Sequence, residues 1–88
     1  MTQEFTYRPK MVCSTEITFE LDAENKIHNL RFRGGCNGNL KAIGRLVEGQ
    51  EASKVSEILR GNTCGPRPTS CADQFSKAID QALAEKNA

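Results

Sequence analysis

The chain has 88 residues, a formal net charge of +1 and a hydrophobic content of 38%. This length suits one domain with a single core, and the core is thin because an average globular chain is roughly 45–50% apolar. Acidic and basic residues are mixed and nearly balanced, which argues against nucleic acid or a membrane surface as a partner. No segment approaches the roughly 20 apolar residues that span a bilayer, and the first residues lack a secretory signal pattern. We therefore expect a cytoplasmic protein.

Three strands are predicted in the first half of the chain. Residues 14–22 and 27–33 carry apolar side chains at every second position, the pattern of half-buried strands. The short polar turn between them predicts an antiparallel hairpin in which the numbers of paired residues sum to 49, as for Asp22 and Ile27. Residues 4–7 form a further short strand.

Three helices are predicted in the second half, over residues 40–47, 52–59 and 72–85. Ser70 and Asp73 have the spacing of a capping box at the start of the last helix. The apolar faces of the first two helices consist of Leu40, Ile43, Leu46, Val47, Ala52, Val55, Ile58 and Leu59. Because strands precede helices, residues 1–88 are predicted to form one α+β domain, a small antiparallel sheet covered on one face by three helices.

The four cysteines, Cys13, Cys36, Cys64 and Cys71, fall at the ends of predicted elements or in loops. The cytoplasm keeps thiols reduced, so they suggest metal ligation or thiol chemistry rather than disulfides. The predicted register places Cys13 opposite Cys36, since their numbers also sum to 49. The lone histidine, His28, is interpreted as a core or edge residue with its hydrogen bonds satisfied.

Two of the cysteines, Cys36 and Cys71, lie next to predicted helix starts, where the helix dipole favours a thiolate. Six residues separate Cys64 from Cys71, and two prolines stiffen this loop. We therefore predict that all four thiols meet at one metal site.

Nearly the whole of this sequence resembles the TSCPD-domain family. The segments that carry the resemblance are Gly34-Gly-Cys-Asn-Gly-Asn-Leu40 and Cys64-Gly-Pro-Arg-Pro-Thr-Ser-Cys-Ala-Asp73. The motif that names the family reads Thr-Ser-Cys-Ala-Asp here, with Ala72 in place of proline. Similar domains occur at the C-terminus of cobalamin-dependent ribonucleotide reductases and as small separate proteins, so the resemblance implies an association with ribonucleotide reductase and with DNA synthesis.

The order of elements is also similar, more distantly, to U-type iron–sulfur cluster scaffold proteins. That resemblance matches Cys13, Cys36 and Cys71 to the three cluster-binding cysteines and leaves Cys64 without a counterpart. Thr15 stands where the scaffold has an aspartate, and the residue before its last cysteine is serine rather than histidine. A fourth cysteine instead favours a closed, static site.

The leading hypothesis is a metal-binding module in which four thiolates hold zinc tetrahedrally. The alternatives are an iron–sulfur cluster on the same cysteines and a thiol redox relay in which Cys64 and Cys71 pass electrons to a reductase. No catalytic set of residues is recognised, and 88 residues hold neither the barrel nor the nucleotide pocket of a ribonucleotide reductase. We therefore expect an accessory of that enzyme or of another reductase. A homodimer through the exposed sheet face is compatible with the sequence.

Overall fold

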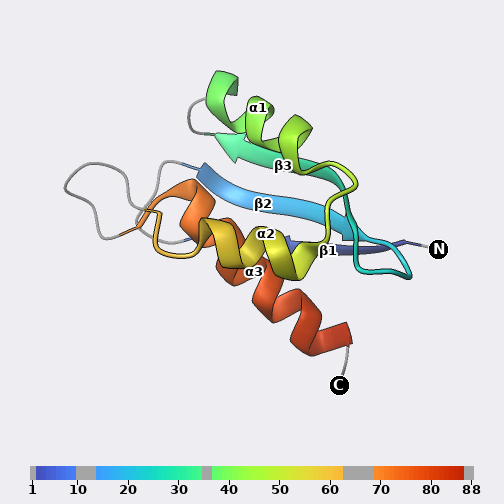
Figure 1. The fold of residues 1–88 in the computed structure, drawn as a ribbon. Coiled ribbons are helices and arrows are strands. Elements are labelled where there is room, and N and C mark those ends of the chain that lie inside the picture. Colours follow the sequence, from blue (N-terminus) through green and yellow to red (C-terminus); the bar gives the residue numbers. More distant parts are fainter. Residues whose placement is uncertain (1, 10–13, 35–36, 63–68, 87–88) are drawn as a thin grey trace.

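The computed structural model describes residues 2–9, 14–34, 37–62 and 69–86 (Figure 1). It confirms the predicted α+β class. In chain order the elements are β1 (Gln3–Tyr7), β2 (Ser14–Leu21), β3 (Ile27–Gly34), α1 (Asn37–Val47), α2 (Ala52–Leu59) and α3 (Cys71–Lys86). Among the helices of these described segments, none has the length and apolar character needed to cross a bilayer.

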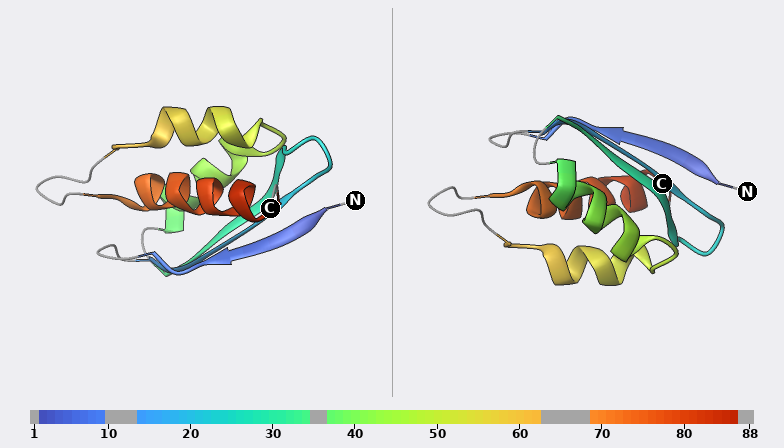
Figure 2. Two further views of the ribbon diagram at one scale, coloured as in Figure 1. Left: turned by 90° about the horizontal axis from the view of Figure 1, so that it is seen from below. Right: turned by 90° about the horizontal axis from the view of Figure 1, so that it is seen from above.

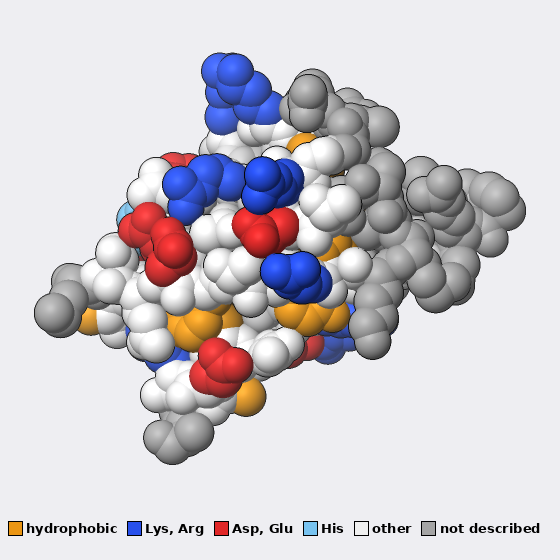
Figure 3. Space-filling model, turned by 180° about the vertical axis from the view of Figure 1, so that it is seen from behind, with side chains coloured by type: hydrophobic (Ala, Val, Ile, Leu, Met, Phe, Trp, Pro, Cys, Tyr) orange, Lys and Arg blue, Asp and Glu red, His pale blue; other side chains and the backbone are white. Residues whose placement is uncertain are grey.

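The sheet is antiparallel, with the strand order β1-β2-β3, and all three helices lie on one side of it (Figure 2). Helix α1 packs on β3, and α3 crosses β1 and β2. Helix α2 packs along α3 and forms the layer farthest from the sheet. The opposite face of the sheet carries acidic and basic side chains next to one another (Figure 3).

The core lies between the sheet and α3. The alternating side chains Ile17, Phe19 and Leu21 of β2 are completely buried, as their period of two predicts. Phe75 of α3 meets Phe19 edge to face with 5.3 Å between the ring centroids, and Phe5 of β1 stacks on Phe19 at 5.8 Å. Aromatic pairs of this kind contribute about 0.5–1.5 kcal/mol beyond the area they bury. This cluster fixes the position of α3 on the sheet.

The hairpin register is confirmed in the middle of the strands and differs at both ends. Thr18 pairs with Arg31, which gives the predicted sum of 49. The register shifts by one residue towards the turn, so the predicted pairing of Asp22 with Ile27 is wrong, and Leu21 pairs with Ile27 instead. The shift arises at a bulge in β3, where Asn29 and Leu30 stand opposite the single residue Phe19 and Asn29 has a positive φ of 55°.

A second shift lies at the open end of the hairpin, where Ser14 pairs with Gly34. The numbers of this pair sum to 48, so the register that placed Cys13 opposite Cys36 does not extend to this end. Both cysteines lie outside the described residues. The structure nevertheless places the described residues that precede Cys36 and follow Cys13 on neighbouring strands.

Two helices begin earlier than predicted. Helix α1 starts at Asn37, so the residues interpreted as a turn before residue 40 form its first turn. Helix α3 starts at Cys71, which is therefore its first residue rather than the residue before it. Helix α2 has the predicted bounds. Gly49 and Gly61, which follow α1 and α2, adopt positive φ angles of 76° and 82°, as is common for glycine after a helix.

Candidate functional site

Cys71 is the one predicted metal ligand that lies within the described residues. It is half-buried and opens α3. Cys13, Cys36 and Cys64 lie outside them, so their predicted meeting with Cys71 stays a prediction. Over the segments that the structure describes, no three His, Cys, Asp or Glu side chains gather as a metal would require. A site with three or more such ligands would therefore have to include at least one of the three cysteines outside these segments.

The residue before Cys71 caps the helix. Ser70 Oγ accepts the backbone N–H of Asp73 at 3.1 Å, which confirms the serine half of the predicted capping box. The same hydroxyl donates to the carbonyl oxygen of Asn62, and the Asn62 side-chain amide lies 3.4 Å from it. Ser70 is 8% exposed. It therefore fixes the helix start and also ties it to the residues that follow α2.

The carboxylate of Asp73 forms the second connection. It accepts the hydroxyl of Thr69 at 2.5 Å and the backbone N–H of Gly61 at 2.7 Å. Because the hydrogen bond from Thr69 favours the charged form, with smaller contributions from Gly61 and from the nearby charge of Lys77, the pKa of Asp73 lies below its usual 3.8 despite burial. Gly61 reaches this carboxylate from a positive φ that glycine adopts without strain.

Together these bonds close a loop. Gly61 and Asn62 at one end and Thr69 and Ser70 at the other are joined by the hydrogen bonds just described. The chain between them, residues 63–68, lies outside the described residues. The closure thus places Asn62, two residues before Cys64 in the sequence, beside Ser70, which precedes Cys71.

A third connection joins the start of α3 to the sheet. Gln74 donates to the Thr69 hydroxyl at 3.0 Å and accepts from the hydroxyl of Tyr7 at 3.4 Å. Tyr7 is the last residue of β1 and pairs with Ile17 of β2. One end of the molecule holds four of these termini: the start of β2, the end of β3, the start of α1 and the start of α3 (Figures 1 and 2).

A comparison with protein-family models finds a match to the TSCPD domain over residues 2–83. The chain belongs to the TSCPD-domain family. No curated protein and no solved structure matched the chain in the other two comparisons.

The TSCPD motif of this protein, residues 69–73, divides into residues with different tasks. Three of them are buried and form the hydrogen bonds that close the loop: Thr69, Ser70 and Asp73. Ala72 is also buried, in the first turn of α3. Cys71 is more accessible than these four neighbours, since it is half-buried. The motif therefore builds a rigid helix start that carries a single thiol.

Sequence reasoning assigned Asp73 only to the capping box and missed the loop closure. The signal was available in principle, because Thr69 and Asp73 are four residues apart at a helix start, and a glycine follows the preceding helix. The donors that reach the Asp73 carboxylate depend on how α2 and α3 pack, and that packing is not predicted from the sequence.

A second polar cluster, centred on His28, lies at the opposite end of the hairpin. The ring nitrogen Nε2 is 2.8 Å from Asp22 Oδ2, and Nδ1 is 2.6 Å from Glu48 Oε2. Only the protonated ring donates from both nitrogens, so these two carboxylate contacts favour the charged form. The bond to Asp22, followed by the bond to Glu48, raises the pKa of His28 above 6.5, and the bond from His28 is the largest cause that lowers the pKa of Asp22 to about 2. The cluster ties the end of α1 to the hairpin, as expected for a satisfied edge histidine.

This cluster predicts a pH-dependent stability. Because the folded-state pKa of His28 is raised, its stabilisation is complete below about pH 6.5 and is lost as the pH rises through the folded-state value. The stabilisation from Asp22 is lost only on acidification, as the pH falls below 3.8 towards about 2. We expect the thermal midpoint to fall between about pH 6 and 8, and the NMR titration of the single histidine to lie above 6.5.

The variant His28→Gln is the control, and its midpoint should be flat over the same pH range. A histidine titration at or below its ordinary pKa would contradict this interpretation. So would an equal pH slope in the variant.

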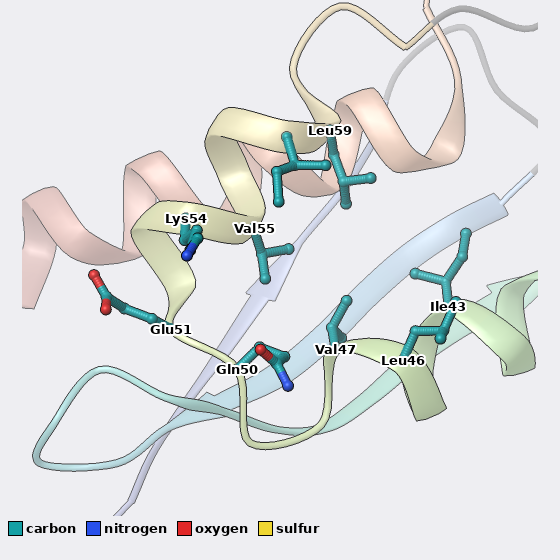
Figure 4. A pocket seen from close by; sticks show the side chains of 9 residues that line it. Ile43, Leu46, Val47, Gln50, Glu51, Lys54, Val55 and Leu59 are labelled. Carbon is teal, nitrogen blue, oxygen red and sulfur yellow. The ribbon is translucent and has the colours of Figure 1, made fainter.

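An apolar groove of about 340 Å³ separates α1 from α2 (Figure 4). Its walls include Ile43 and Val47 of α1 and Val55 of α2. At its rim, Leu46 is 76% exposed and Ile58 is 71% exposed. Their predicted burial in the helix faces is wrong, because α2 packs along α3 and leaves this gap beside α1. Figure 4 shows the gap between the two helices.

Proposed function

We propose that this TSCPD-domain protein is a zinc-binding module in which Cys13, Cys36, Cys64 and Cys71 together hold one zinc ion. The observation that carries the proposal is the common location of their described neighbours. Cys71 starts α3, at the end of the molecule where β2 and α1 begin and β3 ends. Four thiolates are a complete ligand set for a closed tetrahedral zinc site.

Chain connectivity supports this arrangement. Consecutive Cα atoms are about 3.8 Å apart. Cys13 directly precedes Ser14, the first residue of β2, and Cys36 directly precedes Asn37, the first residue of α1. Ser14 pairs with Gly34, the last residue of β3, which comes two residues before Cys36 in the sequence. Cys13 and Cys36 are therefore each one residue away, along the chain, from a described residue at this end.

Cys64 follows Asn62 by two residues, and Asn62 is hydrogen-bonded to Ser70, the residue before Cys71. Closing the loop between these positions costs conformational entropy. The hydrogen bonds of Ser70 and Asp73 offset this entropy already in the metal-free protein. We therefore expect Cys64 and Cys71 to be preorganised for a shared ligand. This preorganisation favours a permanent structural metal over a transient one.

We further propose that the module is an accessory of a reductase, with ribonucleotide reductase the partner that the family resemblance implies. The support is indirect. The described residues contain an exposed apolar rim at Leu46 and Ile58, which is the kind of surface that protein partners cover. Independent catalysis by this domain is not part of the proposal.

Elemental analysis tests the metal. Protein purified without chelator is expected to contain about one zinc per chain, with few thiols that react before denaturation. Serine variants of each cysteine should lose zinc, since a hydroxyl does not replace a thiolate ligand. The matched control His28→Gln should keep its zinc, because His28 is engaged by two carboxylates.

Three results would contradict zinc, and each points elsewhere. Iron with sulfide and a brown colour after anaerobic purification would identify a cluster on the same cysteines. A reversible Cys64–Cys71 disulfide that exchanges with thioredoxin would identify a redox relay. A folded, metal-free protein with four reactive thiols would remove the site altogether.

A further inference from the structure

The two edges of the sheet differ in how they are covered. At the β3 edge, the N–H of Ile27 donates to the carbonyl oxygen of Gln50, and the carbonyl oxygen of Ile27 accepts from Gly49. Helix α1 also packs on β3. Strand β1 pairs with β2 alone, so among the described segments its second side has no strand beside it. An uncovered edge of this kind is a template for a further strand.

The sequence of this edge is complementary to itself. If two copies of β1 pair antiparallel about Thr6, the numbers of paired residues sum to 12. Glu4 then faces Arg8 of the second copy, Phe5 faces Tyr7, and Thr6 faces Thr6. Opposite charges, aromatic pairs and threonine pairs are the cross-strand combinations that stabilise antiparallel sheets. All three kinds occur in this one register.

The side chains also lie on the correct faces. Phe5 is buried on the helix side of the sheet, and the Tyr7 hydroxyl reaches Gln74 on the same side. Glu4, Thr6 and Arg8 are exposed. In the paired register, the aromatic side chains of both copies therefore share the helix side. The charged pairs and the threonines share the open face, where the sheet already carries mixed charges (Figure 3).

The helix side of this edge is hollowed. A groove of about 160 Å³ runs between β1 and α3, and its lining includes Phe5, Tyr7 and the small residues Ala78 and Ala82. A strand added to β1 would extend the sheet beneath this groove and place its own aromatic side chains against it. Glu4 is paired with Arg31 at 3.2 Å on the open face, and the carboxylate retains a second oxygen for Arg8 of the second copy.

We propose that the β1 edge is a homodimer interface, at which two copies join their sheets by antiparallel pairing centred on Thr6. The interface is independent of the proposed metal site. A strand pair of this length buries less than a standard interface of about 1,600 Å². The dimer is therefore reversible, and its fraction rises with protein concentration.

Sedimentation equilibrium under reducing conditions tests the proposal, since no disulfide can then contribute. The wild-type protein should show a monomer–dimer equilibrium. Glu4→Arg and Arg8→Glu should each weaken the dimer about tenfold, because each places like charges opposite one another twice. An equimolar mixture of the two variants should recover the dimer, since every Arg then faces a Glu.

The matched controls are Glu57→Arg and Arg45→Glu, which make the same changes in charge at exposed helix positions. Both should dimerise as the wild type does, and circular dichroism should show that all four variants are folded. A wild-type protein that stays monomeric up to about millimolar concentration would overturn the proposal. Variants that dimerise like the wild type, or a mixture that fails to recover the dimer, would overturn it too.

Discussion

Replacing Asp73 with alanine is expected to lower the free energy of unfolding by about 2–4 kcal/mol, because hydrogen bonds to a charged group contribute about 1.5–3 kcal/mol each and are not additive. The carboxylate is 5% exposed and accepts from Thr69 and from the N–H of Gly61. Alanine would leave the buried Thr69 hydroxyl and the Gly61 N–H without this acceptor. Chemical denaturation monitored by circular dichroism measures the effect.

The matched control is Glu85→Ala, which removes an acidic side chain from an exposed position of the same helix. Its free energy of unfolding should change by no more than about 0.5 kcal/mol. Asp73→Asn should fall between the two, since the amide retains one acceptor oxygen but presents an N–H₂ group to the second donor. Equal stability of all three variants would show that the loop closure contributes nothing.

The sequence predicts the elements well where a periodic pattern coincides with burial. The buried alternation of Ile17, Phe19 and Leu21 identified β2, and the apolar stripe that includes Phe75 identified α3. Both patterns report contact with one core, which is a property of each element by itself. The class and the element order follow from such patterns.

The hairpin register shows where this reasoning stops. The one-residue shift towards the turn depends on an extra residue that β3 takes up at Asn29, whose backbone N–H donates to the Glu48 carboxylate. That contact joins segments far apart in the sequence, so a strand pattern does not predict it. Leu46 and Ile58 were assigned to buried faces because a helical stripe shows that a face is apolar, not that something covers it. Their exposure follows from the packing of α2 on α3.

The candidate site divides in the same way. Cysteine placement and the family motif indicated Cys71 and a helix start, and the structure confirms that it opens α3. The bonds from Thr69 and Gly61 to Asp73 were not predicted, because they join two helices that are separated by a loop. They nevertheless hold Gly61, three residues before Cys64 in the sequence, beside the start of α3.

If zinc is bound as proposed, removing it should have the largest effect on stability. Structural zinc in small domains contributes an apparent binding free energy of about 10–16 kcal/mol at pH 7, which is as large as the whole stability of a typical domain, about 5–15 kcal/mol. Since about 1 kcal/mol shifts the midpoint of a domain of this size by roughly 4–8 °C, a strong chelator should lower the thermal midpoint by more than about 10 °C. Differential scanning calorimetry measures the shift.

Zinc added back should restore the midpoint and magnesium should not, because thiolates select the softer metal. Cys71→Ser should lower the midpoint without chelator and respond little to it. Asp73→Ala offers a sharper comparison, since it retains all four thiols but loosens the loop before Cys71. It should keep a chelator response while binding zinc more weakly in competition with a chromogenic chelator. If the chelator leaves the thermal midpoint of the wild-type protein unchanged, the fold is stable without metal and the four cysteines serve another purpose.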